Sequence, residues 1–323
     1  MRIWLGAVIA AAAVLGCGAD EDKLGPCGTG FVRTAGGNCV PVADDADTDT
    51  DTDTDTDTDT DTDTGAGLSI APEMVLIPAG SFQMGCTPGQ EVTGFCEDDE
   101  FPVHTVTFTR DFWLGQTEVT QAEFELAVGY RASHFTACGG DCPVDQASWS
   151  EAAAYANAVS AVEDLQSCYD CIGSGETVAC TPAMDPYECE GYRMATEAEW
   201  EYAARCGEDM AYPGSNTAVE VGWNSDNSGE QTHRVAQFSP NACGLYDMSG
   251  NVWEWTADWY SSSTYTSTPR TDPSGPSVGD SRAKRGGAWH TVPRDARIGN
   301  RIPYYPEGVP GIFGLRLART APQ

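Results

Sequence analysis

The residues that decide the fold run from Gly244 to Trp259 and read GLYDMSGNVWEWTADW. Three tryptophans stand close together at the end of this stretch, and Gly, Asp, Asn and Glu residues separate the apolar ones. Trp side chains bury large areas and need a partner for the indole N–H, whereas Gly permits backbone conformations that other residues resist. We therefore expect a buried, irregular segment, too polar for a plain core strand, in which carbonyl and carboxylate oxygens converge.

The chain of 323 residues is strongly acidic, with 49 Asp and Glu against 17 Lys and Arg and a formal net charge of -32. Binding to nucleic acid needs cations that neutralise the phosphates, so this charge argues against nucleic acid as a partner. An excess of carboxylates favours solubility and cation binding. The length suits one large domain or two small ones.

The first residues have the features of an export signal. Met1 and Arg2 precede an apolar run over 3–16, which is too short for a comfortable membrane span. The run ends in VLGC at 14–17, which resembles the bacterial lipobox and implies cleavage before Cys17 and lipidation of its thiol. We expect an exported protein that is lipid-anchored to the cell envelope, at the outer membrane or cell surface. An ordinary signal peptide with a coincidental cysteine is the alternative.

Two segments separate this signal from the folded domain. Residues 17–43 form a short leader, in which Cys27 and Cys39 are expected to close a loop. Residues 44–67 form a linker dominated by an Asp-Thr repeat over 47–64. Like charges at every second position repel and nothing apolar is available to bury, so we expect a disordered, extended stalk. A calcium-binding repeat is the alternative.

Residues 68–323 are expected to form the folded domain. Three helices are predicted where Ser or Thr is followed three residues later by Glu, at Thr120, Ser148 and Thr196. A strand, a turn and a second strand are expected over 74–85, and another strand over 104–108. Beyond Gly207 the pattern predicts turns and short strands. The whole indicates an α+β domain with much irregular structure.

Several stretches of this domain together resemble the formylglycine-generating enzyme family, also called sulfatase-modifying factors. The matching pieces follow the family's order: MVLIPAGSFQMG at 74–85, PVH at 102–104, EVT at 118–120, YRMATEAEWEYAAR at 192–205, the stretch 244–259, RGGAW at 285–289 and GLR at 314–316. The resemblance covers roughly residues 70–320. It implies a C-type-lectin-like fold that is poor in regular secondary structure.

The resemblance also implies a chemistry, which uses two cysteines just after the GG-S/A-W/Y motif. They bind copper and activate oxygen to oxidise a cysteine of a sulfatase, and thiolates suit Cu(I). Here the matching positions in the segment 286–296 are Thr291 and Ala296, and no cysteine follows Cys243. Copper is therefore not expected, and the sequence leaves open whether the chain is an enzyme.

The stretch 244–259 carries a calcium site in the family. Carried over by position, its ligands are the side chains of Asp247 and Glu254 and the carbonyls of Gly250 and Val252. Calcium takes several oxygen ligands in flexible geometry, and two carboxylates nearly neutralise it. We expect bound calcium. A metal-free turn, in which both carboxylates accept backbone N–H groups, is the alternative.

The family's active groove lies at the segment that follows the GG motif. The residues expected to line a ligand cleft there are Trp289, His290, Arg294, Arg297 and Arg301. His290 is also the first candidate ligand for copper or iron in an enzyme with altered ligands. A structural histidine held by hydrogen bonds is the default interpretation.

The 13 cysteines are too many for an ordinary cytosolic enzyme and indicate an oxidising compartment. Without Cys17 their number is even, which suits disulfides. The expected pairs are Cys86 with Cys96, Cys138 with Cys142 and Cys206 with Cys243. A local insert holds four more that suit two disulfides or, alternatively, a zinc site: Cys168, Cys171, Cys180 and Cys189.

These features leave two main functions. The first is a lipid-anchored, extracytoplasmic binding or accessory module with a calcium-stabilised domain and a peptide or glycan ligand. The second is a formylglycine-generating-type oxidase or a non-heme metal oxygenase with altered ligands. A purely structural role at the cell surface is a third. Metal analysis separates the first two, because calcium alone supports the first and stoichiometric copper or iron supports the second.

Overall fold

The computed structural model describes residues 31–33, 39–41, 70–90 and 94–322, and the chain divides into two units, 1–62 and 63–323. In the first unit, β1 (Phe31–Arg33) pairs antiparallel with β2 (Cys39–Pro41). The expected signal with Cys17, the leader's Cys27 and the Asp-Thr linker lie outside the described residues. Among the helices that are described, none is long and apolar enough to cross a membrane.

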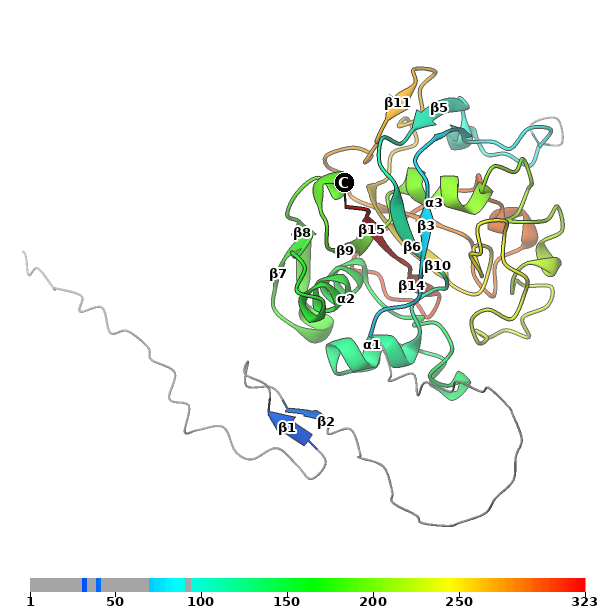
Figure 1. Ribbon diagram of the computed structural model, residues 1–323. Coiled ribbons are helices and arrows are strands. Elements are labelled where there is room, and N and C mark those ends of the chain that lie inside the picture. Colours follow the sequence, from blue (N-terminus) through cyan, green and yellow to red (C-terminus); the bar gives the residue numbers. More distant parts are fainter. Residues whose placement is uncertain (1–30, 34–38, 42–69, 91–93, 323) are drawn as a thin grey trace, which may run out of the picture. The chain divides into compact units, whose positions relative to one another are not determined.

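The second unit is an α+β domain with three α-helices and many short strands (Figure 1). The helices are α1 (Gln121–Val128), α2 (Trp149–Val162) and α3 (Glu197–Arg205). Each begins at its predicted capping box, in which the Ser or Thr side chain and the Glu side chain satisfy each other's backbone N–H groups. The 3-10 helices are η3 (Asp98–Glu100), η4 (Thr136–Cys138), η5 (Gly175–Thr177), η6 (Pro186–Glu188), η7 (Ala218–Glu220) and η8 (Pro293–Ala296).

The strands form small sheets. Their bounds are β3 (Met74–Ile77), β4 (Ser81–Met84), β5 (His104–Thr107), β6 (Phe112–Gly115), β7 (Tyr169–Ile172), β8 (Ala179–Pro182), β9 (Tyr192–Met194), β10 (Trp253–Trp259), β11 (Arg270–Thr271), β12 (Arg282–Arg285), β13 (Ile302–Tyr304), β14 (Phe313–Leu315) and β15 (Leu317–Thr320). The sheet orders are β13-β12-β10-β14, β3-β6-β15-β9, β11-β5-β4 and β7-β8. Both strands predicted over 74–85 are present, but they belong to different sheets, because β3 pairs with β6 and β4 pairs with β5.

The stretch that opened the sequence analysis divides into two unlike halves. Its first half is irregular as expected, and Asp247 and Asn251 both have a φ of +55°. Its second half contains β10, a buried strand between β12 and β14, where we expected no plain core strand, and the pairing of β10 with β12 shifts register between Trp255 and Trp259. That expectation is wrong because residues distant in sequence satisfy the polar side chains of β10: Glu254, for example, is paired with Arg316.

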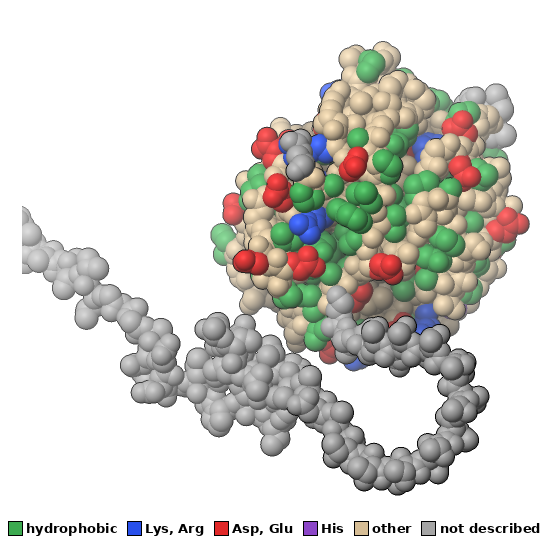
Figure 2. Space-filling model, in the orientation of Figure 1, with side chains coloured by type: hydrophobic (Ala, Val, Ile, Leu, Met, Phe, Trp, Pro, Cys, Tyr) green, Lys and Arg blue, Asp and Glu red, His purple; other side chains and the backbone are tan. Residues whose placement is uncertain are grey.

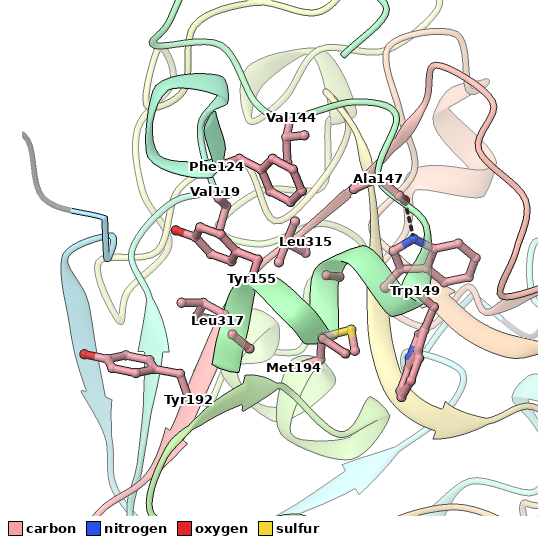
Figure 3. Packing of buried hydrophobic residues seen from close by; sticks show 14 of the residues in the cluster. Val119, Phe124, Val144, Ala147, Trp149, Tyr155, Tyr192, Met194, Leu315 and Leu317 are labelled. Atoms are coloured by element: carbon pink, nitrogen blue, oxygen red, sulfur yellow. Dashed lines mark hydrogen bonds between the residues drawn. The ribbon is translucent and has the colours of Figure 1, made fainter. Parts of the chain in front are cut away.

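The largest hydrophobic cluster joins α2 to strands β9, β10, β14 and β15, and Figure 3 shows part of it. The Trp149 indole donates to the Thr256 carbonyl, and the Trp255 indole donates to the Ala147 carbonyl, both at 2.9 Å. Both tryptophans thus bury their rings without leaving an N–H unpaired. This packing holds the central strand β10 in place beneath the helix.

Ten cysteines of the domain form five disulfides. The three pairs predicted individually are confirmed: Cys86–Cys96, Cys138–Cys142 and Cys206–Cys243. The insert is closed by Cys168–Cys189 and Cys171–Cys180, so its sulfurs are bonded to one another, and the zinc alternative is wrong. The hairpin β7–β8 is thereby tied to the segment before β9 and packs against α2 (Figure 1).

Charge is distributed differently on the surface and in the interior. Asp and Glu side chains are spread between apolar ones over the visible face of the domain (Figure 2). Seven arginines, in contrast, are buried within the described residues. Cations in this acidic chain are therefore largely used inside the domain, where a charge needs a partner.

Candidate functional site

The two positions that match the family's copper cysteines meet in the structure. A Cβ placed on Gly287 would lie 2.8 Å from the Ala296 Cβ and 3.5 Å from the Thr291 Cγ2. Both side chains are buried, with exposed fractions of 6% for Thr291 and 1% for Ala296. The Thr291 hydroxyl accepts the N–H of Ala288 at 2.9 Å. The position of the copper site thus holds a hydroxyl that is already hydrogen-bonded and a methyl group.

Apolar packing closes the space on one side of this position. Ala296 belongs to a cluster of buried side chains formed with Ala211, Tyr212, Ala218 and Val221. A methyl group in such a cluster offers neither a ligand atom nor a proton. In the segment after the GG motif, the two positions that match the copper cysteines are therefore occupied by packed, non-thiol side chains.

Trp289 and His290 lie nearer the surface. Trp289 is half-buried, its ring packs edge-on against Phe135 at 5.3 Å between centroids, and its indole donates to the Gly311 carbonyl at 3.3 Å. His290 is exposed, and its ring centroid lies 5.0 Å from that of Trp289. Partial burial and the nearby Lys284 ammonium lower the pKa of His290. These two residues are accessible, as a ligand cleft requires.

Two of the three arginines of the expected groove do not share this exposure. Arg294 is exposed and paired with Glu97. Arg297 is 1% exposed and binds Glu100 through Nη1 and Nη2 at 3.0 and 2.6 Å. Arg301 is 2% exposed and binds Glu197 through Nε and Nη2 at 2.8 and 2.6 Å. Arg297 and Arg301 therefore lie in the interior and do not line a groove, because buried carboxylates hold them there.

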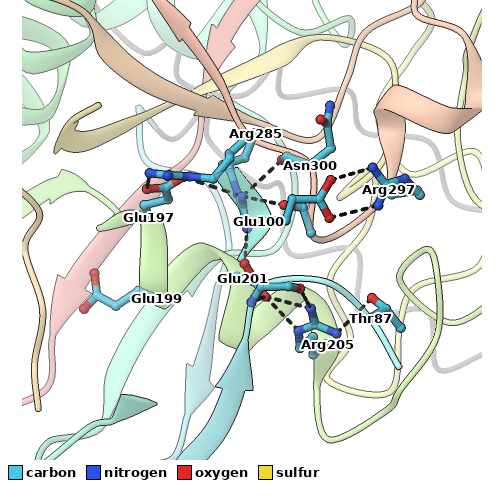
Figure 4. A network of polar contacts seen from close by, with 12 residues as sticks. Thr87, Glu100, Glu197, Glu199, Glu201, Arg205, Arg285, Arg297 and Asn300 are labelled. Carbon is cyan, nitrogen blue, oxygen red and sulfur yellow. Dashed lines mark hydrogen bonds and ion pairs between the residues drawn. The ribbon is translucent and has the colours of Figure 1, made fainter. Parts of the chain in front are cut away.

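These carboxylates belong to a buried network around α3 (Figure 4). Glu199 binds Arg193 through both oxygens at 2.7 and 2.8 Å. Glu201 binds both Arg205 and Arg285. Burial alone would raise the pKa of Glu197, but the guanidinium groups of Arg301 and Arg285 lower it overall. Glu197, Glu199 and Glu201, all buried on α3, are therefore anionic members of an internal network.

Asp247 lies in the irregular half of the 244–259 stretch. Its Oδ2 accepts the N–H of Ala236 at 2.6 Å, whereas its Oδ1 is buried without a hydrogen-bond partner. Burial raises the pKa of Asp247 to about 6. A buried carboxylate oxygen with no donor is a natural ligand for a cation.

Glu254, the other carboxylate of the expected calcium site, already has partners. Arg316 donates to it through Nε and Nη2 at 3.0 and 2.7 Å, and the Trp200 indole donates at 2.7 Å. A carboxylate has about four lone-pair sites. Glu254 is therefore a weaker fit for calcium than Asp247.

Sequence reasoning missed a third carboxylate here, Glu118, which follows β6. It is fully buried and accepts the N–H of Val252 at 3.1 Å and the Asn251 amide at 2.8 Å. Burial and the nearby charges of Asp247 and Glu254 raise its pKa well above the ordinary value. The only sequence signal for Glu118 was its place in the EVT motif at 118–120. Of these three carboxylates, only Asp247 keeps a buried oxygen without a hydrogen-bond partner, so Asp247 is the residue of the cluster that fits a cation best.

Comparison with known proteins identifies the family of the domain. Residues 62–321 match the family model described as "Sulfatase-modifying factor enzyme 1-like domain". A formylglycine-generating enzyme of Thermomonospora curvata is 33% identical over 268 residues, which cover 68% of this chain and 83% of that protein. A protein named chaperone protein LppX, from Paenibacillus barcinonensis, is 29% identical over 281 residues, which cover 78% of this chain and 91% of that protein.

Two solved structures have similar folds. The Treponema denticola variable protein 1 has a TM-score of 0.66 and 30% identity, and the match covers 77% of this chain and 95% of that one. PvdO from Pseudomonas aeruginosa has a TM-score of 0.63 and 28% identity, with 79% and 96% covered. Matched residues, fold and motif order agree, and the chain therefore belongs to the sulfatase-modifying factor family and has the formylglycine-generating-enzyme fold.

Proposed function

We propose that this chain is a lipid-anchored, extracytoplasmic binding or accessory module that lacks copper-cysteine oxidase chemistry. The observation that carries the proposal is the pair Thr291 and Ala296, which stand buried and packed where the family's copper cysteines are expected. Holding Cu(I) in the family's manner needs thiolates. A binding role keeps the framework of the fold without that requirement, and its ligand is a peptide or a glycan.

The test is a direct assay of cysteine oxidation. The purified chain is incubated with copper, oxygen and a sulfatase peptide that contains the target cysteine, and the peptide is examined by mass spectrometry for an aldehyde. We expect no conversion, while the Thermomonospora curvata formylglycine-generating enzyme serves as the positive control. Conversion by the unaltered chain would refute the proposal.

The lipid anchor and the acidic stalk are part of the same proposal. The VLGC exit at 14–17 and the Asp-Thr repeat over 47–64 support it, and so do five disulfides, which persist in oxidising compartments. When the unaltered chain is expressed in a bacterium, it should sediment with the membrane fraction, and labelled fatty acid should be incorporated into it. Cys17→Ser should abolish both, and a membrane-bound, labelled Cys17→Ser chain would rule out this anchor.

Calcium has a structural role in this proposal. The Asp247 carboxylate, with the Gly250 and Val252 carbonyls and Glu254, would hold the ion, and the ion would supply positive charge to the buried carboxylates. These residues already orient the site: Gly250 has a φ of +88°, and a Cβ there would lie 2.1 Å from the Trp223 carbonyl oxygen. Only glycine allows this close approach, which shapes the turn that presents Asp247.

An oxidase or oxygenase with altered ligands is the second candidate. One observation favours it, because the lowered pKa of His290 keeps an exposed imidazole neutral and able to bind a metal. Among the described residues, however, the group of three potential ligands that lie close together is Cys86, Cys96 and Glu100, and its two sulfurs are disulfide-bonded. Stoichiometric copper or iron in the purified protein, lost in His290→Ala, would establish this candidate.

A further inference from the structure

One buried arginine differs from all the others. Six of the seven buried arginines in the described part of the chain form an ion pair with a carboxylate: Arg193, Arg205, Arg285, Arg297, Arg301 and Arg316. Arg282, the first residue of β12, is 2% exposed and has no such pair among these residues. A buried charge without a partner is costly, so the missing anion needs an explanation.

The surroundings of Arg282 hold its guanidinium in a fixed plane. Its Cζ lies 3.8 Å from the Trp149 ring centroid and 3.6 Å from that of Trp259, so that two indoles sandwich the cation. Nη1 donates to the Ala257 carbonyl at 2.6 Å. Nε is buried with no partner, and within the described residues Nη2 makes no hydrogen bond. The Nε and Nη2 edge of the group therefore has no hydrogen-bond partner among the described residues.

The nearest carboxyl group does not neutralise this charge. Asp258 interacts electrostatically with Arg282, but its Oδ2 accepts the N–H of Glu197 at 2.8 Å. Burial raises the pKa of Asp258 to about 8, so this carboxyl is largely protonated at neutral pH. Arg282 consequently remains an uncompensated cation in the folded domain.

The same edge of the guanidinium binds carboxylates elsewhere in this molecule. Arg301 holds Glu197 through Nε and Nη2, and Arg316 holds Glu254 through the same two atoms. Two parallel N–H groups match the two oxygens of a carboxylate, which gives strength and a defined orientation. The Nε and Nη2 edge of Arg282 is therefore preorganised for a carboxylate that the described residues do not supply.

Arg282 also lines a cavity. It has a volume of about 340 Å³ and is lined by Arg282, Arg193 and Trp259 from the sheets, by Tyr169 and Met184 from the disulfide-closed insert, and by the segment Ser274–Ser277. Cavities of this size hold small ligands. Arg193 adds a second buried Nε without a hydrogen-bond partner. The aromatic and apolar walls suit the body of a ligand, and the guanidinium suits its charged end.

We propose that this cavity binds a carboxylate-bearing ligand, with the carboxylate on the Nε and Nη2 edge of Arg282 and an apolar or aromatic body against Trp259 and Met184. The ligand is a small organic acid or the carboxyl terminus of a peptide, which share this chemistry. The proposal gives a ligand class to the binding role proposed above and rests on it. The two fail separately, because cysteine oxidation and carboxylate binding are measured independently.

The test uses the full chain and N-acetylphenylalanine as the probe, with N-acetylphenylalanine amide as its uncharged match. Isothermal titration calorimetry should detect the acid, and binding of the amide should be at least about tenfold weaker because it lacks the second acceptor. The peptide Ala-Ala-Ala-Phe, with a free or an amidated carboxyl terminus, distinguishes the two kinds of ligand. If the free peptide binds as tightly as the probe, the cavity accepts the carboxyl terminus of a peptide. If it binds more weakly, the cavity is specific for small acids.

Two kinds of variant locate the binding. Arg282→Met should weaken binding of the acid at least about tenfold while near-UV circular dichroism reports an intact fold. If Arg282→Met does not fold, Asp185→Asn replaces it as the test. The exposed Asp185 lines the cavity, and Asn keeps the oxygen that accepts the Tyr187 N–H at 2.9 Å. Loss of this like charge should tighten binding about two- to threefold, whereas Asp170→Asn, exposed on β7 and away from the cavity, should leave it unchanged.

Three results would overturn the proposal. The first is equal binding of acid and amide. The second is no detectable binding when the acid is present at about 10 mM, because a Kd above that concentration is too weak for a specific site. The third is displacement of the bound acid by chloride or inorganic phosphate at equal concentration, which would show a general anion site in place of a carboxylate site.

Discussion

Arg301 and Arg282 occupy similar surroundings with opposite outcomes. Each guanidinium is buried between two aromatic rings, Tyr260 and Tyr265 for Arg301 and Trp149 and Trp259 for Arg282. Arg301 has Glu197 on its Nε and Nη2 edge, whereas Arg282 has a cavity beside it. The network around α3 is thus complete within the chain, and the Arg282 region is complete only with an added anion.

The cluster of Glu118, Asp247 and Glu254 shows the reverse imbalance, since among the described residues only Glu254 of the three forms an ion pair, with Arg316. Balanced buried charges in this domain therefore mark structural positions, and unbalanced ones mark candidate sites for a ligand or an ion. The following predictions test that distinction, beginning with the largest expected effect.

Breaking the balanced pair should cost the most. Arg301→Met leaves the Glu197 carboxylate without its bidentate partner, and removing one member of a buried ion pair costs about 3–5 kcal/mol in the free energy of unfolding. Urea unfolding followed by tryptophan fluorescence measures this. The matched control is Arg131→Met, which removes an ion pair to Glu125 between side chains that are 57% and 41% exposed, and it should change stability by no more than about 1 kcal/mol.

Calcium should stabilise the carboxylate-rich cluster by a smaller amount. At a free calcium concentration about 100 times its Kd, mass action adds about 2.7 kcal/mol to the free energy of unfolding, and EDTA should remove it. Asp247→Asn should abolish most of this difference. It should not destabilise the calcium-free domain, because it removes a buried charge. A chain whose unfolding midpoint is the same in calcium and in EDTA would disprove the calcium site.

The pH dependence of stability should reveal Asp258. Its folded pKa of about 8 lies above the ordinary value of about 4 in an unfolded chain. The folded state therefore binds the proton more tightly, and the stabilisation is present below about pH 4 and lost as the pH rises to about 8.

In Asp258→Asn the free energy of unfolding should consequently fall less with pH than in the unaltered chain, by up to about 1.4 kcal/mol per pH unit. Urea midpoints of the unaltered chain and of Asp258→Asn are measured across pH 4–8. Both proteins contain Asp247, so its titration cancels when the two pH profiles are subtracted. If the two proteins lose stability with pH in parallel, Asp258 does not titrate between pH 4 and 8 in the folded domain.

The smallest effect is expected where the charge is unbalanced. Arg282→Met loses the stacking on two indoles but also removes a buried, unpaired cation, so the free energy of unfolding should change by about 1 kcal/mol or less. The comparison with Arg301→Met is direct, because both substitutions remove a guanidinium between two rings. Equal destabilisation by the two would mean that the carboxylate partner does not decide the stability.

Much of the fold was predictable because it depends on local rules. The three helices begin at capping boxes whose partners are three residues apart, for example Thr120 and Glu123. The disulfide Cys138–Cys142 joins residues four apart. The order of the motifs indicated the family, which the comparison of residues 62–321 confirms.

The candidate sites were predictable only in part. Sequence reasoning placed Thr291 and Ala296 at the family's copper positions, and the structure brings them together at Gly287. It placed Arg297 and Arg301 in a groove, although Glu100 and Glu197 hold them in the interior. It overlooked Glu118 and Arg282, because nothing in a linear sequence shows which buried charge lacks a partner.

Three properties could be predicted from the residues alone: where the helices start, which cysteines pair over short distances, and that Thr291 and Ala296 replace the cysteines of the family's reaction. These properties depend on the identity of a residue and of near neighbours, so they can be read from the chain. The folded domain was needed to show that 253–259 forms a central strand, that Arg301 is balanced by a glutamate 104 residues away, and that Arg282 has no carboxylate partner among the described residues. The cost of a buried charge depends on every group packed around it, and that set exists only in the folded domain.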